Sequence, residues 1–166
     1  MQLKNCFFMV SIACLISFGC AGKKIPPEIL DRVNYQGGFS NLQANPESYI
    51  GRYVILGGKI IGTESFENYS EILVLQLPLK TNYRPNPEKP SEGRFIIRSE
   101  TLLDPAVYSP GLLVTAAGEI TGRATRAVGS YQYVYPVARP DQIWSWEPGR
   151  DYFPNLHFGI GVGAVF

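Results

Sequence analysis

The feature that most constrains this chain is its first twenty residues. Lys4 gives a positive start, an apolar run extends from Cys6 to Phe18, and Gly19-Cys20 closes it. A charged start followed by such a run predicts a secretory signal peptide. The run of about 13 residues is too short to span a bilayer as a helix, which needs about 20. We therefore expect residues 1–19 to be removed.

The end of this run favours processing as a lipoprotein. Phe18 is too large for an ordinary cleavage window, whereas Gly19-Cys20 is typical of a bacterial lipobox, although Ser17 stands where that motif usually has leucine. In such a motif a diacylglycerol is attached to the cysteine thiol, the chain is cut before the cysteine, and the new amine is acylated. These chains would anchor the protein stably to a membrane through Cys20. An ordinary signal peptide or a buried structural cysteine is the alternative.

The residue that follows the cysteine predicts which membrane receives the protein. It is Ala21 and not aspartate, which resembles lipoproteins of the outer membrane rather than those retained at the inner membrane. Cys6 and Cys14 lie in the segment to be removed, so we expect no disulfide in the mature chain. Its fold must then rest on its apolar core.

Length and charge limit the class of protein further. About 147 residues remain after cleavage, which is one domain. Loss of Lys4 leaves 14 basic against 14 acidic residues, a formal net charge of zero. Nucleic-acid binding and polybasic membrane binding both need an excess of positive charge. We expect neither of them.

The chain divides into a polar N-terminal part, a β-rich part and a tail. Residues 20–45 are predicted to be a lipidated tether with one short helix beginning near Pro27, and residues 148–166 a C-terminal tail rich in glycine and aromatic residues. Between them, residues 46–147 hold short β-type runs separated by Gly, Pro and Asn, typical of an all-β barrel or sandwich. The predicted strands are Arg52–Thr63, Glu71–Leu79, Gly93–Ser99, Leu112–Thr125, Tyr131–Val137 and Gln142–Trp146.

Five or six strands with glycine kinks favour a small closed or nearly closed barrel. In the third run, Phe95 and Ile97 are expected to face inward, with Ile96 facing outward. The segment from Thr81 to Glu92 contains three prolines and is predicted to be a solvated loop.

A set of short motifs in a fixed order resembles the Slp family, the starvation-inducible outer-membrane lipoproteins. The motifs are the lipobox, Asn45-Pro46-Glu47, Tyr49-Ile50-Gly51, Gly57-Gly58-Lys59-Ile60, Gln76 to Leu79, Gly93-Arg94-Phe95, Leu103-Asp104-Pro105 with Tyr108, Gly111, Gly118, and Tyr135-Pro136-Val137 leading to Trp144. The resemblance implies an outer-membrane lipoprotein with an OB-like barrel, no known catalytic residues, and links to starvation and acid stress.

The residue types in the sequence, and their spacing, do not indicate an enzyme. His157 is the single histidine, so no metal cluster and no Ser-His-Asp arrangement is expected. Asp104 precedes a proline and is predicted to open a turn rather than to act as a catalytic acid, and Asp141 and Glu147 are interpreted in the same way. We expect no catalytic residue, no metal and no cofactor other than the covalent lipid.

One set of aromatic residues leaves two interpretations open. Tyr131, Tyr133 and Tyr135 would share one strand face, and Trp144 and Trp146 another. They pack the core, or they form a face on which a cell-wall glycan or an envelope protein partner stacks. The second interpretation makes the alternative function a glycan-binding or hydrolytic protein.

The segment Leu156–Phe166 alternates apolar residues with glycines like the last strand of an outer-membrane barrel. Three arrangements are open for this segment. It packs on the domain as an extra strand, it lies at the membrane surface or pairs with the strand edge of another protein, or it is disordered. We favour the second because Pro148-Gly149 and Pro154 separate it from the barrel. A complete transmembrane barrel is not expected, since it needs at least eight strands.

Overall fold

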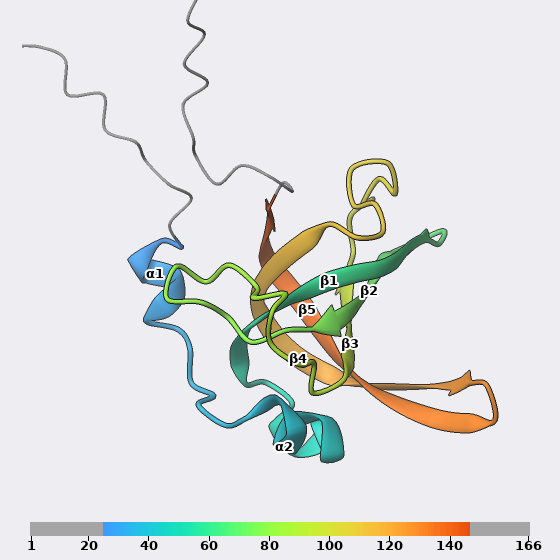
Figure 1. Ribbon diagram of the computed structural model, residues 1–166, viewed down its shortest axis with the longest axis horizontal. Helices are drawn as coiled ribbons and strands as arrows, with labels where there is room; N and C mark the ends of the chain where they lie inside the picture. Colours follow the sequence, from blue (N-terminus) through green and yellow to red (C-terminus); the bar gives the residue numbers. More distant parts are fainter. Residues whose placement is uncertain (1–24, 147–166) are drawn as a thin grey trace, which may run out of the picture.

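The computed structural model describes residues 25–146 (Figure 1). These residues form two short helices, a 3₁₀ helix and five strands. The helices are α1 (Pro27–Leu30), α2 (Phe39–Ala44) and the 3₁₀ helix Pro46–Tyr49. The strands are β1 (Tyr53–Ser65), β2 (Ser70–Gln76), β3 (Arg94–Ser99), β4 (Leu113–Val128) and β5 (Tyr131–Trp146). No helix in this range is long and apolar enough to cross a membrane.

The five strands close into a barrel in the order β1-β2-β3-β5-β4. Neighbouring strands are antiparallel except for β3 and β5, whose parallel pairing through Ile96 and Val137 completes the ring. A closed ring leaves no edge strand unpaired. The prediction of an all-β, OB-like barrel is confirmed.

The last two predicted strands, Tyr131–Val137 and Gln142–Trp146, form a single strand, β5. Here the structure differs from the sequence prediction. Pro140, which lies between the two predicted strands, is within β5 opposite Gly118, at a register shift that leaves Asp141 bulged. Proline is tolerated at a bulge because its missing N–H interrupts no ladder bond there. A Cβ atom on Gly118 would overlap the Arg139 carbonyl, so this glycine permits the close approach of the two strands.

The barrel interior is filled by alternate side chains of the strands. Phe95 and Ile97 face inward, as predicted, and pack with the central residues of β1, β2 and β4. Helix α2 adds Phe39 and Leu42 to this cluster, and the Phe39 and Phe95 rings lie 6.0 Å apart between centroids. Helix α2 thus packs across the barrel below β1 and β4 in the view of Figure 1.

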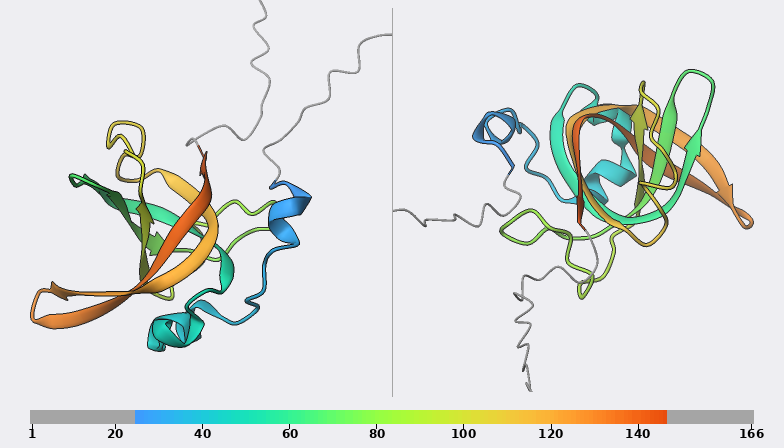
Figure 2. Two further views of the ribbon diagram at one scale, coloured as in Figure 1. Left: turned by 180° about the vertical axis from the view of Figure 1, so that it is seen from behind. Right: turned by 90° about the horizontal axis from the view of Figure 1, so that it is seen from above.

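The part of the predicted tether that the structure describes, residues 25–45, is packed on the barrel. Ile25 and Ile29 are buried against Tyr53, Ala117 and Trp144 on the outer face. The Asn34 side chain accepts a hydrogen bond from the Tyr53 amide at 2.8 Å. The short helix predicted to begin near Pro27 is present as α1. The sequence did not indicate that residues 25–45 pack on the barrel, because α1 and α2 are too short to show a repeating apolar stripe. Figure 2 shows it running along one side of the barrel.

The far ends of β4 and β5, residues 121–136, extend beyond the barrel as a long hairpin that we call the arm (orange in Figure 1). Its Tyr135 packs against Ile96, which points outward as predicted but is fully buried beneath this hairpin. Next to them the buried carboxylate of Glu71 binds Arg98 of β3 at 2.8 Å and Arg126 of the arm. The arm is therefore fastened to β2 and β3 by an apolar cluster and an ion-pair network.

Candidate functional site

The three tyrosines predicted to share a face are in three different environments. Tyr131 lies at the tip of the arm and is 78% exposed, whereas Tyr135 is buried. Tyr133 lies between them: its hydroxyl accepts hydrogen bonds from the Arg94 amide at 3.0 Å and from the Gln43 side chain. Tyr133 therefore connects the arm to β3 and α2. Of the three, Tyr131 alone is free to stack on a ligand.

The two tryptophans are packed against the outer face of β1 and β4. Trp144 contacts the cluster that contains Ile25 and Tyr53. Trp146 is 9% exposed, and its indole N–H donates to the hydroxyl of Thr115 at 2.9 Å. That hydroxyl in turn donates to the backbone carbonyl of Tyr83 at 2.7 Å. For both tryptophans the structure favours the packing interpretation.

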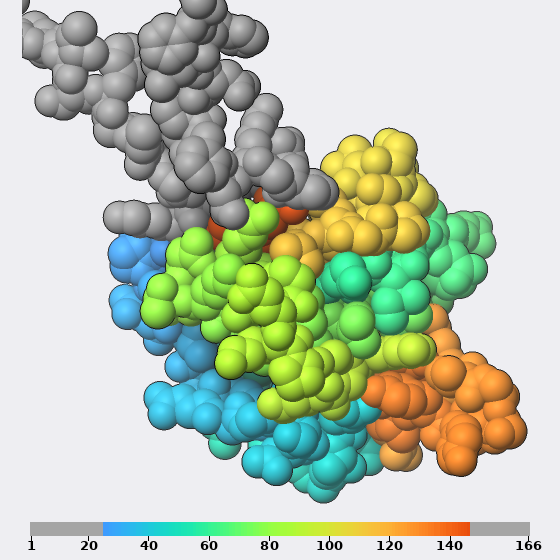
Figure 3. All heavy atoms as spheres, viewed as in Figure 1, coloured from blue at the N-terminus to red at the C-terminus, as the bar shows by residue number. Residues whose placement is uncertain are grey.

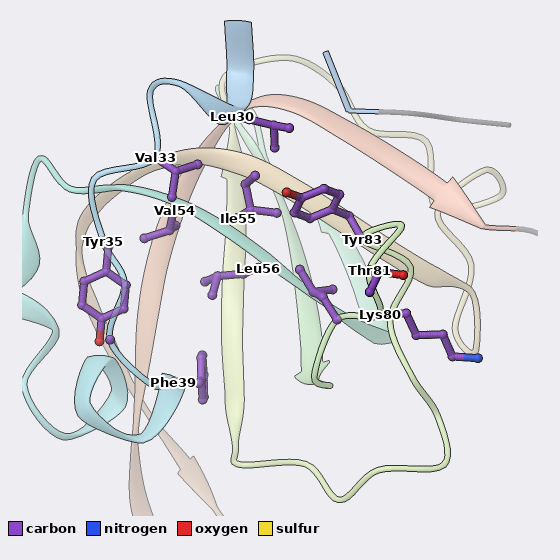
Figure 4. A pocket seen from close by; sticks show the side chains of 12 residues that line it. Leu30, Val33, Tyr35, Phe39, Val54, Ile55, Leu56, Lys80, Thr81 and Tyr83 are labelled. Atoms are coloured by element: carbon purple, nitrogen blue, oxygen red, sulfur yellow. The ribbon is translucent and has the colours of Figure 1, made fainter. Parts of the chain in front are cut away.

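The hydrogen bonds from Trp146 lead to a groove on the same side of the molecule. It lies between the segment that follows α1 and the 77–93 loop, above β1, and has a volume of about 400 Å³. Apolar side chains line it, from α1, β1 and the loop: Leu30, Val33, Ile55, Leu56 and Leu79, with Tyr83 across one end (Figure 4). We call it the side groove. The space-filling view shows the loop (yellow-green) beside the N-terminal segment (blue) (Figure 3).

The loop that borders the side groove has a fixed conformation. Tyr83 has a φ of 63°, and it is the one non-glycine residue with positive φ within residues 25–146. This conformation is unfavourable for a bulky residue and persists where its surroundings hold it. Here the Tyr83 amide donates to the Lys80 carbonyl at 2.8 Å, and the Tyr83 carbonyl accepts the bond from Thr115. The ring is thereby directed into the groove (Figure 4).

The prediction of a solvated loop over Thr81–Glu92 was thus wrong for part of its length. Pro85 is fully buried and Tyr83 half-buried, and Leu79 and Pro85 form an isolated β-bridge. Tyr83, an aromatic residue between Leu79 and Pro85 in an otherwise polar stretch, is the sequence signal that indicates a packed loop. Three prolines indicated a loop, but not whether the loop is packed.

A polar cluster holds the N-terminal segment beside the groove. Arg32 forms an ion pair with Asp141 at 2.5 Å and lies 4.1 Å from the centre of the Tyr53 ring. The Tyr53 hydroxyl donates to Asp141 at 3.1 Å. Burial, followed by the hydrogen bond to Asp141 and its negative charge, raises the pKa of Tyr53 above its ordinary value of 10.0. Burial likewise raises the pKa of Tyr35, with Tyr49 as the next cause.

The acidic residues have structural partners. Asp141 was predicted to open a turn, but it lies in β5, where the bulge aims its side chain at Arg32 and Tyr53. The turn predicted at Asp104 is confirmed, because its carboxylate accepts from the Ala106 amide at 2.8 Å. Over residues 25–146 no group of three His, Cys, Asp or Glu side chains is placed to hold a metal ion. Cys20, Glu147, His157 and the segment Leu156–Phe166 lie outside the described residues.

Barrel, arm and side groove together define a small OB-like β-barrel protein whose N-terminal segment is packed along the outer barrel wall. The chain matches the model of the outer membrane lipoprotein Slp family over residues 18–159. It belongs to that family, as the sequence motifs predicted, and its relatives support a place in the outer membrane or envelope.

Relatives with curated sequences agree with this assignment. An uncharacterized protein of Haemophilus influenzae is 28% identical over 82% of this chain and 76% of its own length. The uncharacterized lipoprotein YeaY of Escherichia coli is 29% identical over 61% of this chain and 52% of its own length. The outer membrane protein Slp of E. coli is 24% identical and covers 100% of this chain and 88% of its own length.

Among solved structures, the small single-stranded DNA-binding protein from Streptomyces coelicolor is similar over 57% of this chain and 93% of its own length. The TM-score is 0.38 and the sequences are 10% identical.

Proposed function

We propose that this protein is a non-catalytic module of the bacterial envelope that is anchored in the outer membrane by lipid on Cys20. Family membership and the lipobox at Ser17-Phe18-Gly19-Cys20 support the anchor. The observation that carries the proposal is the short distance along the chain from Cys20 to the folded domain. Ile25, five residues later, is already buried on the barrel.

This spacing limits how far the domain can lie from the bilayer. Five residues span at most about 18 Å when fully extended. The lipid chains would therefore keep the α1 side of the barrel, with the side groove, close to the membrane surface. The described acidic residues support a non-catalytic role, because Glu71, the one buried carboxylate among them, is neutralised by two arginines.

Substituting Cys20 tests the anchor. Cys20→Ser removes the thiol that takes the diacylglycerol, so we expect the protein to leave the membrane fraction or to stay unprocessed. Cell fractionation with mass spectrometry of the N-terminus measures both outcomes. Cys14→Ser is the matched control, because this cysteine lies in the predicted signal peptide, and it should be anchored like the wild type. Normal processing and anchoring of Cys20→Ser would refute the proposal.

The alternative of glycan binding or hydrolysis on an aromatic face loses most of its support. Of the five aromatic residues on which it rested, Tyr131 is the one with an exposed ring. A contact with a glycan or an envelope protein at the arm tip stays as the second candidate, and loss of a crosslinked partner in Tyr131→Ala would favour it.

A further inference from the structure

We propose that the side groove binds the acyl chain of one long-chain fatty acid, with the carboxylate at the rim formed by Lys80 and Thr81. The anchoring proposed above bears on this inference in one respect, because the adjacent membrane would supply the fatty acid. Binding itself needs no anchor, so the two proposals can fail separately.

The lining of the groove fits an acyl chain. Leu30 and Val33 lie on one side and Leu79 and Tyr83 on the other (Figure 4). Ile55 and Leu56 of β1 line the groove from opposite faces of the strand (Figure 4). All six are half-buried, so each still exposes apolar surface to the groove. Removing this surface from water favours binding of an apolar chain in proportion to the area covered.

The volume of the groove indicates one chain rather than two. A water molecule occupies about 30 Å³ of liquid, and a methylene group is of similar size. The groove of about 400 Å³ therefore holds roughly a dozen methylene groups. One fatty acid fills it with its carboxylate at the opening, whereas the two chains of a phospholipid exceed it.

The rim provides groups that recognise an anionic head. Lys80 is exposed on the loop that borders the groove, with its ammonium group directed outward, and Thr81 lies beside it (Figure 4). Within residues 25–146 the Lys80 ammonium group forms no ion pair, and the hydroxyl groups of Thr81 and Tyr83 form no hydrogen bond. A carboxylate would pair with the ammonium group and accept from the Thr81 hydroxyl.

Hydrogen bonds hold the loop wall of the groove in place. The hydrogen bonds from Trp146 through Thr115 to the Tyr83 carbonyl fix the backbone that carries the Tyr83 ring. A wall that is ordered before binding lowers the entropy cost of ligand capture. Trp146 is then a positioning residue for the groove, and contacts no ligand itself.

The test uses the mature chain, residues 20–166, carrying Cys20→Ser so that no acyl chain is attached. A fluorescent polyene fatty acid is titrated into the protein and displaced with palmitate. We expect saturation at one probe per chain. Val33→Trp fills the groove and should weaken binding at least tenfold, whereas Val107→Trp, at an exposed valine in another loop, should leave it unchanged. Absence of saturable binding, or equal binding by the two variants, overturns the proposal.

Lys80→Gln tests the head group. It should weaken the binding of palmitate several-fold and leave that of the uncharged hexadecanol unchanged, and equal losses for both ligands would overturn the role of Lys80. If Val33→Trp fails to fold, a photoreactive fatty acid on the wild-type chain gives the same answer: labelling must fall on residues 30–35, 54–56 or 79–83. Binding that occurs only after residues 147–166 are deleted would mean that the tail fills the groove, which also overturns the proposal.

Discussion

The inside and the outer face of the barrel are stabilised in different ways. The inside is an apolar cluster in which alternate residues of the strands meet, and Phe95 at its centre has no exposed surface. The outer face is covered by three segments, namely the α1 region, the 77–93 loop and the arm. Each is held by a few specific polar contacts beside a small apolar cluster. The comparison teaches that regular packing sets the architecture, while single contacts set the surfaces on which a ligand can bind.

The largest effect should come from the inside. Phe95→Ala leaves a cavity beside Phe39, and we expect it to lower the free energy of unfolding by about 3–5 kcal/mol. Urea unfolding followed by circular dichroism measures this loss. Phe66→Ala is the control, since this phenylalanine is exposed in the β1-β2 turn, and it should cost less than 1 kcal/mol. Similar losses in the two variants would contradict the distinction between the two regions.

The next largest effect concerns the arm. Glu71→Gln removes the charge that pairs with Arg98 and Arg126. The carboxylate is 3% exposed, but the arginines are 42% and 41% exposed, so water partly solvates them after the change. We therefore expect a loss of about 1–2 kcal/mol, below the cost of a fully buried pair. Urea unfolding serves again as the measurement.

Glu119→Gln is the matched control for the arm. This carboxylate pairs with Arg139 at 2.9 Å, and both side chains are well exposed. Exposed ion pairs contribute about 0–1 kcal/mol, so the control should be nearly neutral. If it costs as much as Glu71→Gln, burial is not what makes the Glu71 network important.

A smaller effect is expected at the loop wall of the side groove. Trp146→Phe keeps most of the ring packing and deletes the hydrogen bond to Thr115, which should lower the free energy of unfolding by about 1 kcal/mol. Protease nicking within residues 77–93 should also become faster, because the Tyr83 backbone is held less firmly. Trp144→Phe deletes no such bond to Thr115 and should leave nicking unchanged; faster nicking in both variants would refute the role assigned to Trp146.

The smallest effect is a dependence on alkaline pH. The folded state raises the pKa of Tyr53 above 10.0, so its neutral form is favoured on folding. The resulting contribution to stability is complete below the unfolded pKa of about 10 and is lost as pH rises through the folded value. The difference in unfolding free energy between pH 8 and pH 11 should therefore shrink in Tyr53→Phe. An unchanged difference would show that this phenol does not anchor the N-terminal segment.

Much of the barrel follows from local pattern. Alternation placed Phe95 and Ile97 inside, and the positions of four strands were predicted within a few residues. The single long fifth strand was not predicted, because a proline argues against a continuous strand unless the residue opposite it is known. The partner, Gly118, lies more than twenty residues away, and its missing side chain makes the pairing possible.

The candidate site was the harder part to predict. The sequence indicated five aromatic residues as equal candidates for ligand contact. Of the three tyrosines among them, Tyr135 is buried, Tyr133 is hydrogen-bonded to α2 and β3, and Tyr131 is exposed. Their spacing is identical and their environments are not. Periodicity reports which face a residue occupies, but it contains no information on what covers that face.

By itself, the sequence determined the signal-like start ending in Cys20, the family and the all-β barrel. Each of these depends on neighbouring residues or on motifs in a fixed order. Only the tertiary structure decided that residues 25–45 pack on the barrel wall, that the arm buries Ile96, and that Tyr83 closes one end of a groove. The physical reason is that burial of an outer face requires contact between segments distant in the chain, and such contacts leave no local repeat in the sequence.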